Sequence, residues 1–437
     1  MTLDRDSFRR DKISSIFLHM APPVMLAQLI QALYNIVDSF YIGAYSVRGL
    51  TALSVVYPVQ LLMIALAVGT GVGINTRVAY CNGQRRYQDA EAAAGTGAPL
   101  AVVLWGLFSL AAWFALPSYA AMQTASSQVI GEAVSNGRIV TLCAPGLFLE
   151  SMWTKVCQAN GDMKTPMIGQ ILGALTNIVL DPVLIFGLLG FPRMGIAGAG
   201  TASVIGQAAA AAFVFRKGYR PSPELSRYPR LLASIYRAAL PNILMQAAYT
   251  VYIFGLNIIL ARFSDAAVTA LGLYYKWQTF FFIPLGALQT CIVPVVSFNY
   301  AAGDMDRCHE TMRVSSRFGL ALMTCGLLCF ELLPGQLLSV FTRDADVLSI
   351  GSWGFRVIGW SFLPMILALT YPVYFEAIGR ILTSSVLTLL RTVGLFVPLG
   401  YLFSTFGLSA FWFTFPVTEL VTALAGFLFY HREMSGK

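Results

Sequence analysis

The stretch PVMLAQLIQALYNIVDSFYIG, residues 23–43, decides the fold class of this 437-residue chain. It is long and apolar enough to cross a bilayer as one α-helix, which needs about 20 such residues. Its polar residues Gln28, Gln31, Asn35 and Asp38 are spaced 3, 4 and 3 apart, so they share one face of that helix. A polar stripe on an otherwise apolar helix indicates a cavity or a helix interface inside the membrane.

The composition of the whole chain agrees with a membrane protein. Hydrophobic residues make up 57% of it and charged residues 11%, whereas a soluble domain carries about 25% charged residues. So few charged side chains cannot cover the surface of a soluble protein of this length. We therefore expect lipid to cover most of the surface.

Apolar runs of similar length recur along the chain, and we expect an all-α membrane protein of about 12 transmembrane helices. The first six runs lie at residues 16–42, 51–75, 93–117, 137–157, 166–190 and 195–215. The second six lie at residues 235–261, 269–297, 315–338, 351–378, 382–405 and 407–430.

The distribution of lysine and arginine predicts the orientation of the chain. The net charge of +8 is concentrated in alternate loops and in both tails, whereas the intervening loops hold about one basic residue each. This is the positive-inside pattern of a bacterial inner-membrane protein with both termini in the cytoplasm, and it argues against a nucleic-acid-binding surface. The first fifteen residues are polar and the apolar run that follows is too long for a signal peptide, so we expect no cleavable signal.

The two halves of the chain repeat one another. Residues 22–57 and 240–275 match at a constant offset of 218. The matched pairs include Pro23/Pro241, Leu26/Leu244, Gln28/Gln246, Tyr34/Tyr252 and Tyr57/Tyr275. Because each half has an even number of spans, both halves enter the membrane from the same side, and the axis that relates them should be a pseudo-twofold along the membrane normal.

The repeat divides the chain into two lobes of six helices each. A cavity between or within the lobes is the expected binding site. The expected parts are a cytoplasmic tail (1–15), the N-lobe (16–215), a cytoplasmic linker (216–234), the C-lobe (235–430) and a second cytoplasmic tail (431–437).

Polar residues in the N-lobe predict an ion site. Asn177 and Asp181 are four residues apart on one helix face, and Asp38 and Asp181 lie roughly 20–33 Å along their helices from the cytoplasm. Thr201, entering from outside, reaches the same outer half of the bilayer. Two carboxylates in a low-dielectric site cannot both ionise cheaply, so one holds a proton or a cation lies between them. The alternatives are a structural aspartate pair and a threonine that bonds its own helix backbone.

Further polar residues inside the spans are candidates for substrate contact or for helix packing. Gln28, Gln31, Asn35 and Glu150, in the middle of the fourth span, are the substrate-binding candidates, with interhelical hydrogen bonding as the alternative. In the second half, structural ion pairs or interface positions are the better interpretation, with Glu376 near the cytoplasmic interface and Arg391 reaching toward the cytoplasmic side. The residues concerned are Glu331, Glu376, Glu419, Lys276 and Arg391.

Several function classes lack their motifs. No GxxxxGK[ST] phosphate loop occurs, so we expect no ATP to be used within this chain. Three histidines and seven cysteines without a CxxC pair predict no structural metal, no disulfide and no cofactor. No nucleophile elbow or catalytic cluster is present, so we expect a protein that is not an enzyme.

The order of motifs over nearly the whole chain resembles the multidrug and toxic compound extrusion (MATE) family. The resemblance rests on Pro23–Gly43, Gly69–Ala79, Asn82-Gly-Gln, Gly161-Asp162, Lys164-Thr-Pro, Asn177–Pro182, Gly195–Thr201, Tyr275-Lys276-Trp-Gln and Leu390-Arg391 near Pro398.

This resemblance implies an antiporter that exchanges drugs for Na⁺ or H⁺ by alternating access. It implies cation coupling at Asp38, Asn177, Asp181 and Thr201, and substrate contact at Gln31. Some members also carry acids on the seventh and tenth spans. Here the seventh span has none and Glu376 is offset from the family position, so no cation site is expected in the C-lobe.

We therefore expect a monomeric exporter of small, cationic, amphiphilic compounds. A lipid-linked oligosaccharide or lipid flippase of related architecture is the alternative, but it would call for more spans and for basic residues facing a pyrophosphate head. A passive channel would not need a titratable pair. The sequence names neither the substrate nor the coupling ion.

Overall fold

The structure, a computed structural model, describes residues 7–123 and 126–435, and over these ranges the chain is helical without a strand. The helices of the first half are α1 Ser7–Arg10, α2 Ile13–Tyr45, α3 Val47–Gly83, α4 Tyr87–Gly95, α5 Gly97–Gln123, α6 Ser127–Leu142, α7 Pro145–Ala159, α8 Lys164–Phe186 and α9 Ile196–Gly218. The expected all-α fold class is confirmed.

The second half follows after a short 3₁₀ helix and contains one π-helical segment. Its elements are η1 Leu225–Arg227, α10 Tyr228–Leu260, α11 Asp265–Phe281, α12 Ile283–Ala301, α13 Met305–Leu332, α14 Pro334–Ser339, α15 Ala345–Gly359, α16 Phe362–Ala377, α17 Ile381–Leu389, η2 Leu390–Phe396, α18 Val397–Ser404, α19 Leu408–Phe411 and α20 Thr414–Ser435.

Every predicted span lies mostly on helix, but several of them are divided between two helices, among them residues 269–297, which are shared by α11 and α12. Within the described residues, ten helices are long and apolar enough to cross a membrane, and an eleventh span is the pair α15 and α16, which is bent by 55°. The fourth predicted span, residues 137–157, is divided between α6 and α7, which are 16 and 15 residues long. Each is shorter than the about 20 residues that one bilayer span needs, although together they occupy the place of one span.

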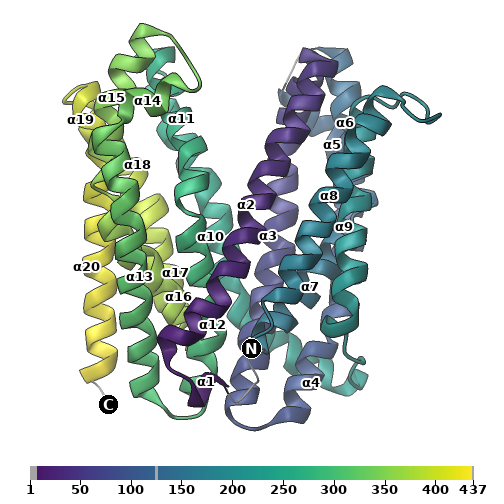
Figure 1. The fold of residues 1–437 in the computed structure, drawn as a ribbon, viewed down its shortest axis with the longest axis vertical. Coiled ribbons are helices and arrows are strands. Elements are labelled where there is room, and N and C mark those ends of the chain that lie inside the picture. The colour runs from purple at the N-terminus through teal and green to yellow at the C-terminus, as the bar shows by residue number, and fades with distance from the viewer. Residues whose placement is uncertain (1–6, 124–125, 436–437) are drawn as a thin grey trace. The chain divides into compact units, whose positions relative to one another are not determined.

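The chain divides into two compact units. Unit 1 contains Leu18–Ala239 with the first residues up to Arg10, and unit 2 contains Leu240 to the C-terminus with the short segment Asp11–Phe17. The division falls inside α10. Figure 1 shows that the long helices within each unit run side by side along one direction, as membrane-spanning helices do.

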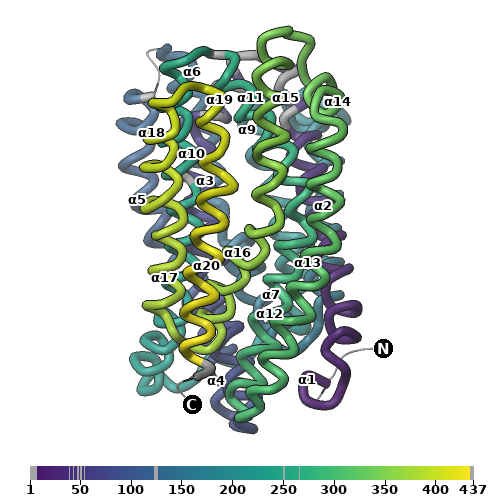
Figure 2. Tube along the Cα trace, turned by 90° about the vertical axis from the view of Figure 1, so that its left-hand side faces the viewer, coloured from purple at the N-terminus to yellow at the C-terminus, as the bar shows by residue number. Residues whose placement is uncertain are grey.

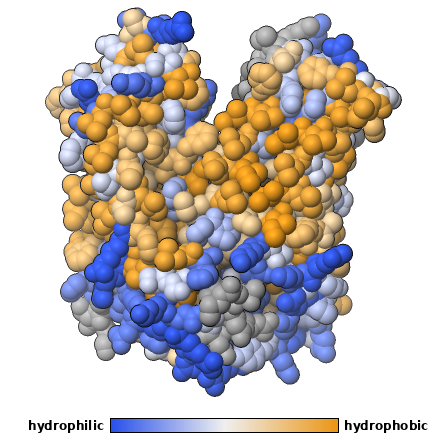
Figure 3. Space-filling view, viewed as in Figure 1, coloured by the Kyte–Doolittle hydropathy of each residue, from blue (hydrophilic) through white to orange (hydrophobic). Residues whose placement is uncertain are grey.

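Hydrophobic and hydrophilic side chains separate along each unit. In Figure 3, hydrophobic side chains cover the middle of each unit, and hydrophilic ones gather at its lower end, which in unit 1 includes α4. Such a band is the surface that lipid covers, because the hydrocarbon core accepts apolar side chains and the interface accepts charged ones.

Small residues bring α8 and α9 of unit 1 into close contact. A Cβ added to Gly173 would lie 2.8 Å from the carbonyl oxygen of Gly206, and one added to Gly206 would lie 2.6 Å from that of Gly173. Only glycine permits this approach, which in membranes provides the van der Waals packing that holds helices together. The predicted ion-site residues of α8 and α9 are therefore fixed on adjoining backbones.

The segment between the halves is shorter than the predicted linker, residues 216–234. Helix α9 continues to Gly218 and α10 begins at Tyr228. The remaining segment is tied to α4 by two ion pairs, Arg220–Glu91 at 2.7 Å and Arg227–Asp89 at 2.5 Å. Since all of these residues belong to unit 1, the segment is part of that unit.

Aromatic side chains form the core of unit 2. Phe330 stacks on Phe355 with ring centroids 4.7 Å apart, and Tyr252 stacks on Phe396 at 4.6 Å. Figure 2 shows α17 and α18 following one another along the unit, with α20 beside them. The π-helical segment η2 lies between α17 and α18, and its second residue is Arg391.

Candidate functional site

The polar stripe of α2 lies on one side of the helix, as its spacing predicts. Gln31 and Asn35 are exposed, whereas Gln28 and Asp38 are partly buried. The stripe is therefore accessible over its middle and covered at Asp38.

The carboxyl groups of Asp38 and Asp181 face each other within hydrogen-bonding range. Asp181 is fully buried, at 0% exposure, and one carboxyl oxygen of Asp38 is buried without a hydrogen-bond partner. A buried acceptor that lacks a donor is uncommon in a folded protein. The pair can accept a proton or a cation.

Asn177 holds Asp181 from one helical turn earlier. With the amide oriented so that its carbonyl faces α9, the Asn177 nitrogen donates to Asp181 Oδ2 at 3.1 Å. The carbonyl oxygen accepts hydrogen bonds from the Ser203 amide at 3.0 Å and from the Ser203 hydroxyl at 3.1 Å. This orientation satisfies both ends of the amide. Asn177, Asp181 and Ser203 thus form one network across α8 and α9.

Thr201 is placed differently from the other three cation-site candidates. Its hydroxyl donates to the carbonyl of Ala197 in its own helix, at 2.8 Å. This is the backbone bond that threonine commonly makes in helices. The structure therefore brings together Asp38, Asn177 and Asp181, and it adds Ser203, which lies two residues beyond Thr201 and hence on another part of the helix surface.

Glu150 extends this polar region through α7. Its carboxylate accepts from the Thr154 hydroxyl at 2.8 Å and from the side chain of Gln170 on α8. The Tyr34 hydroxyl lies within electrostatic range of Glu150 and of both aspartates. Sequence reasoning missed Tyr34, Gln170 and Ser203. Tyr34 lies within the polar stripe of α2, four residues before Asp38, and it could have been found by that spacing.

The donor set fits a monovalent cation bound by oxygen, or a proton. No group of three or more His, Cys, Asp or Glu side chains in the described part of the chain is placed to hold a metal ion. Carboxylate and hydroxyl oxygens are the ligands that hard cations prefer. Asp38 and Asp181 carry carboxylates, and Ser203 carries a hydroxyl.

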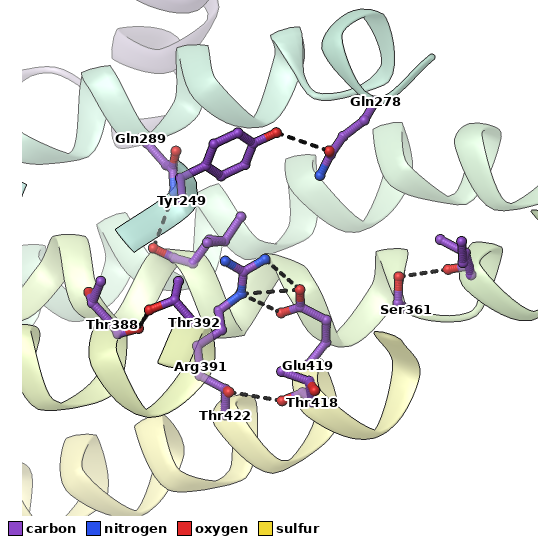
Figure 4. Close-up of polar contacts among 12 residues, drawn as sticks. Tyr249, Gln278, Gln289, Ser361, Thr388, Arg391, Thr392, Thr418, Glu419 and Thr422 are labelled. Atoms are coloured by element: carbon purple, nitrogen blue, oxygen red, sulfur yellow. Dashed lines mark hydrogen bonds and ion pairs between the residues drawn. The ribbon is translucent and has the colours of Figure 1, made fainter. Parts of the chain in front are cut away.

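In the second half, the expected structural ion pair is present between Arg391 and Glu419, but two expected positions are wrong. Arg391 does not extend toward the cytoplasmic side, because its guanidinium pairs with Glu419 inside unit 2 (Figure 4). Glu376 is buried at 2% exposure rather than interfacial, because α16 packs among α12, α17 and α20. Lys276 lies over the ring of Phe341, at 5.1 Å from its centroid.

Comparisons with known proteins agree with this architecture. The MatE family model matches residues 23–183 and 241–402, one match in each half. An FAD transporter of Shewanella oneidensis is 24% identical, over 97% of this chain and 95% of that protein. The multidrug export protein MepA of Staphylococcus aureus is 22% identical, over 96% and 94%. A solved structure of a MOP superfamily transporter from Pyrococcus furiosus superimposes with a TM-score of 0.92 at 21% identity, over 100% and 99% of the two chains.

Long apolar helices in two compact units define a multi-pass helical membrane protein. The chain belongs to the MatE family, the multidrug and toxic compound extrusion transporters, because the family model covers most of both halves. Proteins of this family move small molecules across membranes and are not enzymes. The resemblance found in the sequence is thereby confirmed.

Proposed function

We propose that this protein is a secondary active antiporter that exports small, cationic, amphiphilic compounds in exchange for H⁺ or Na⁺ by alternating access. The supporting observation is the facing pair Asp38 and Asp181, with a buried carboxyl oxygen of Asp38 that lacks a hydrogen-bond partner. An ionisable pair inside apolar helices is costly, and it is expected where an ion is carried.

The pair couples ion binding to the conformation of unit 1. When both carboxylates are charged they repel one another, and a proton or a Na⁺ removes that repulsion. Asn177 keeps Asp181 in place, and Thr201, whose hydroxyl proton is used by Ala197, retains oxygen lone pairs for a cation. The ion must bind the outward- and inward-facing states with different affinity, because only a differential affinity can shift their equilibrium.

Substrate contact is proposed for Gln28, Gln31, Asn35 and Glu150. Gln31 and Asn35 are exposed on α2. Glu150 of α7 lies within electrostatic range of Tyr34, which is also on α2. Acidic groups next to neutral amides favour a cationic substrate. We place the transporter in the bacterial inner membrane as a monomer, with both termini in the cytoplasm and without use of ATP.

The test is uptake of a fluorescent lipophilic cation into inside-out vesicles under an imposed pH or Na⁺ gradient. We expect one gradient to drive accumulation and Asp38→Asn to abolish it. The matched control is Asp306→Asn, which makes the same change at an exposed position of α13 and should transport normally. Accumulation by Asp38→Asn at the wild-type rate would reject the proposal.

A second arm of the same assay addresses the substrate. Because one relative is named an FAD transporter, FAD is offered in parallel with the lipophilic cation. Transport of the cation alone supports the proposed substrate class. Gradient-driven transport of FAD alone would retain the antiport mechanism and replace the substrate.

A further inference from the structure

Unit 2 contains a cavity that the proposed antiport mechanism does not use. Its volume is about 150 Å³. It is lined from α10, α11, α12, α16, α17 and η2, and its lining includes Gln246, Tyr249, Gln278, Phe282, Gln289 and Arg391. Tyr249 is 39% exposed, so the cavity wall reaches the surface of the unit.

Arg391 is the charged residue among the described residues that line this cavity. Its Nε donates to Glu419 Oε2 at 2.9 Å and its Nη2 donates to Oε1 at 2.5 Å. The guanidinium has a third nitrogen, Nη1, which is not used by Glu419. In Figure 4 this nitrogen points away from Glu419, toward the side where Tyr249 and Gln289 lie.

The backbone explains why Arg391 points inward. It is the second residue of the π-helical segment Leu390–Phe396, in which one extra residue is accommodated in a turn. Such segments are rare and occur frequently at functional sites, because they redirect side chains. Arg391 and Glu419 are 7% and 0% exposed, so the redirected charge is removed from water and from lipid.

A purely structural ion pair does not account for the rest of the cavity. Replacing a buried pair by apolar residues is often neutral or stabilising, so the pair by itself is weak evidence for a role in stability. The remaining polar lining is neutral: the Tyr249 hydroxyl donates to Gln278 at 3.2 Å, and Gln289 donates to the Leu369 carbonyl at 3.2 Å. The cavity is thus lined by the edge of one arginine, two amides and a tyrosine ring. Such a lining is suited to a planar oxyanion.

The internal repeat relates part of this cavity to the polar stripe of α2 in unit 1. Over residues 240–275 the offset of 218 pairs Gln246 with Gln28 and Tyr249 with Gln31. The stripe of unit 1 ends at the acid Asp38, whereas Arg391 is the charged residue among the described residues that line the cavity of unit 2. The two places therefore differ in the charge that they offer to a ligand.

We propose that this cavity is a second binding site, which takes the carboxylate group of a small aromatic or amphiphilic anion. Arg391 donates from Nη1 to the carboxylate, while Tyr249 and Phe282 contact the aromatic or apolar part. The volume equals about five water molecules and is below the roughly 300 Å³ of a site for a whole drug. The cavity therefore admits a small anion or the head of a larger one.

The test uses purified full-length protein in detergent, with benzoate as the probe and benzamide as its neutral, isosteric control. Binding is measured by equilibrium dialysis and by the shift in thermal unfolding temperature. We expect wild-type protein to bind benzoate in preference to benzamide. The exposed residue Arg356 of the same unit supplies the matched control, and Arg356→Met should keep the preference.

Two variants separate the binding site from a structural ion pair. The double variant Arg391→Met/Glu419→Met removes both charges without leaving one unpaired, and it should weaken benzoate binding by at least about tenfold, the loss expected for one charge-assisted hydrogen bond. Glu419→Gln removes the competing carboxylate and should tighten benzoate binding. Equal binding of benzoate and benzamide to wild-type protein, or an unchanged preference in either variant, would overturn the proposal.

The measurement needs no ion gradient. Absence of benzoate binding would therefore leave the proposed antiport intact, and loss of antiport would leave this site intact.

Discussion

Gly173 and Gly206 face each other across the contact between α8 and α9, each with its Cα against the carbonyl of the other. This contact lies one turn from Asn177, which hydrogen-bonds to Ser203 on the neighbouring helix. The separation of the two backbones thus sets the geometry of the network that holds Asp181. Close helix packing and the candidate ion site are one structural feature.

Gly206→Val tests this packing. The added methyl groups would meet the Gly173 backbone, and we expect a loss of about 1–3 kcal/mol in the free energy of unfolding, the usual effect of overpacking. The measurement is thermal or denaturant unfolding in detergent. The control is Gly131→Val on α6, where an added Cβ meets nothing within 4 Å. Equal destabilisation by the two variants would show that the α8–α9 contact is not tight.

Asp38 and Asp181 should act as one unit in transport. We expect Asp38→Asn and Asp181→Asn each to abolish gradient-driven accumulation, and the double variant to be no worse than either, because residues that act together show non-additive losses. Uptake into inside-out vesicles measures this. If each single variant lost only part of the transport rate, and the double variant lost the product of the two factors, the two carboxyls would serve separate steps.

Ser203→Ala tests one of the three site residues that sequence reasoning missed. The Asn177 carbonyl would lose one of its two donors and keep the Ser203 backbone amide, so we expect a cost of about 1 kcal/mol, the usual net contribution of one hydrogen bond. The concentration of coupling ion at half-maximal transport should rise several-fold. Ser203→Thr, which keeps the hydroxyl, is the control. An unchanged ion dependence in Ser203→Ala would remove Ser203 from the site.

Asp162, in the turn between α7 and α8, provides a pH-dependent prediction outside the spans. Burial raises the pKa of Asp162, but hydrogen bonds from Thr165 and Lys217 outweigh it and hold that pKa below its usual value. A depressed folded-state pKa contributes stability above the unfolded pKa of about 4, and this is lost as pH falls through the lower folded pKa.

We therefore expect Asp162→Asn to lower the unfolding free energy at pH 7 by up to about 1 kcal/mol, because the Lys217 pair is partly exposed and screened. The difference from wild type should shrink as the pH falls below about 4. Unfolding temperatures from pH 7 to pH 3 measure it, with the exposed Asp306→Asn as the control. A difference that stays constant over this range would assign the effect to packing.

The amino-acid sequence by itself determined the class of fold and named most residues of the candidate ion site. Lipid tolerates only long apolar helices with internally bonded backbones, so hydropathy alone located the spans, and the offset of 218 residues located the repeat. Helical rise placed Asp38 and Asp181 at one depth, and the structure brings them together.

The tertiary structure decided which way each side chain points around its helix axis. Composition placed Thr201 and Arg391 within their spans, but only the packing of α9 against α8 turns Ser203 toward Asn177 while Thr201 bonds its own backbone. Likewise, only the π-helical turn directs Arg391 to Glu419 on α20. Depth along a helix is a local property of the chain, whereas rotation about the axis is fixed by contacts between segments that are distant in sequence.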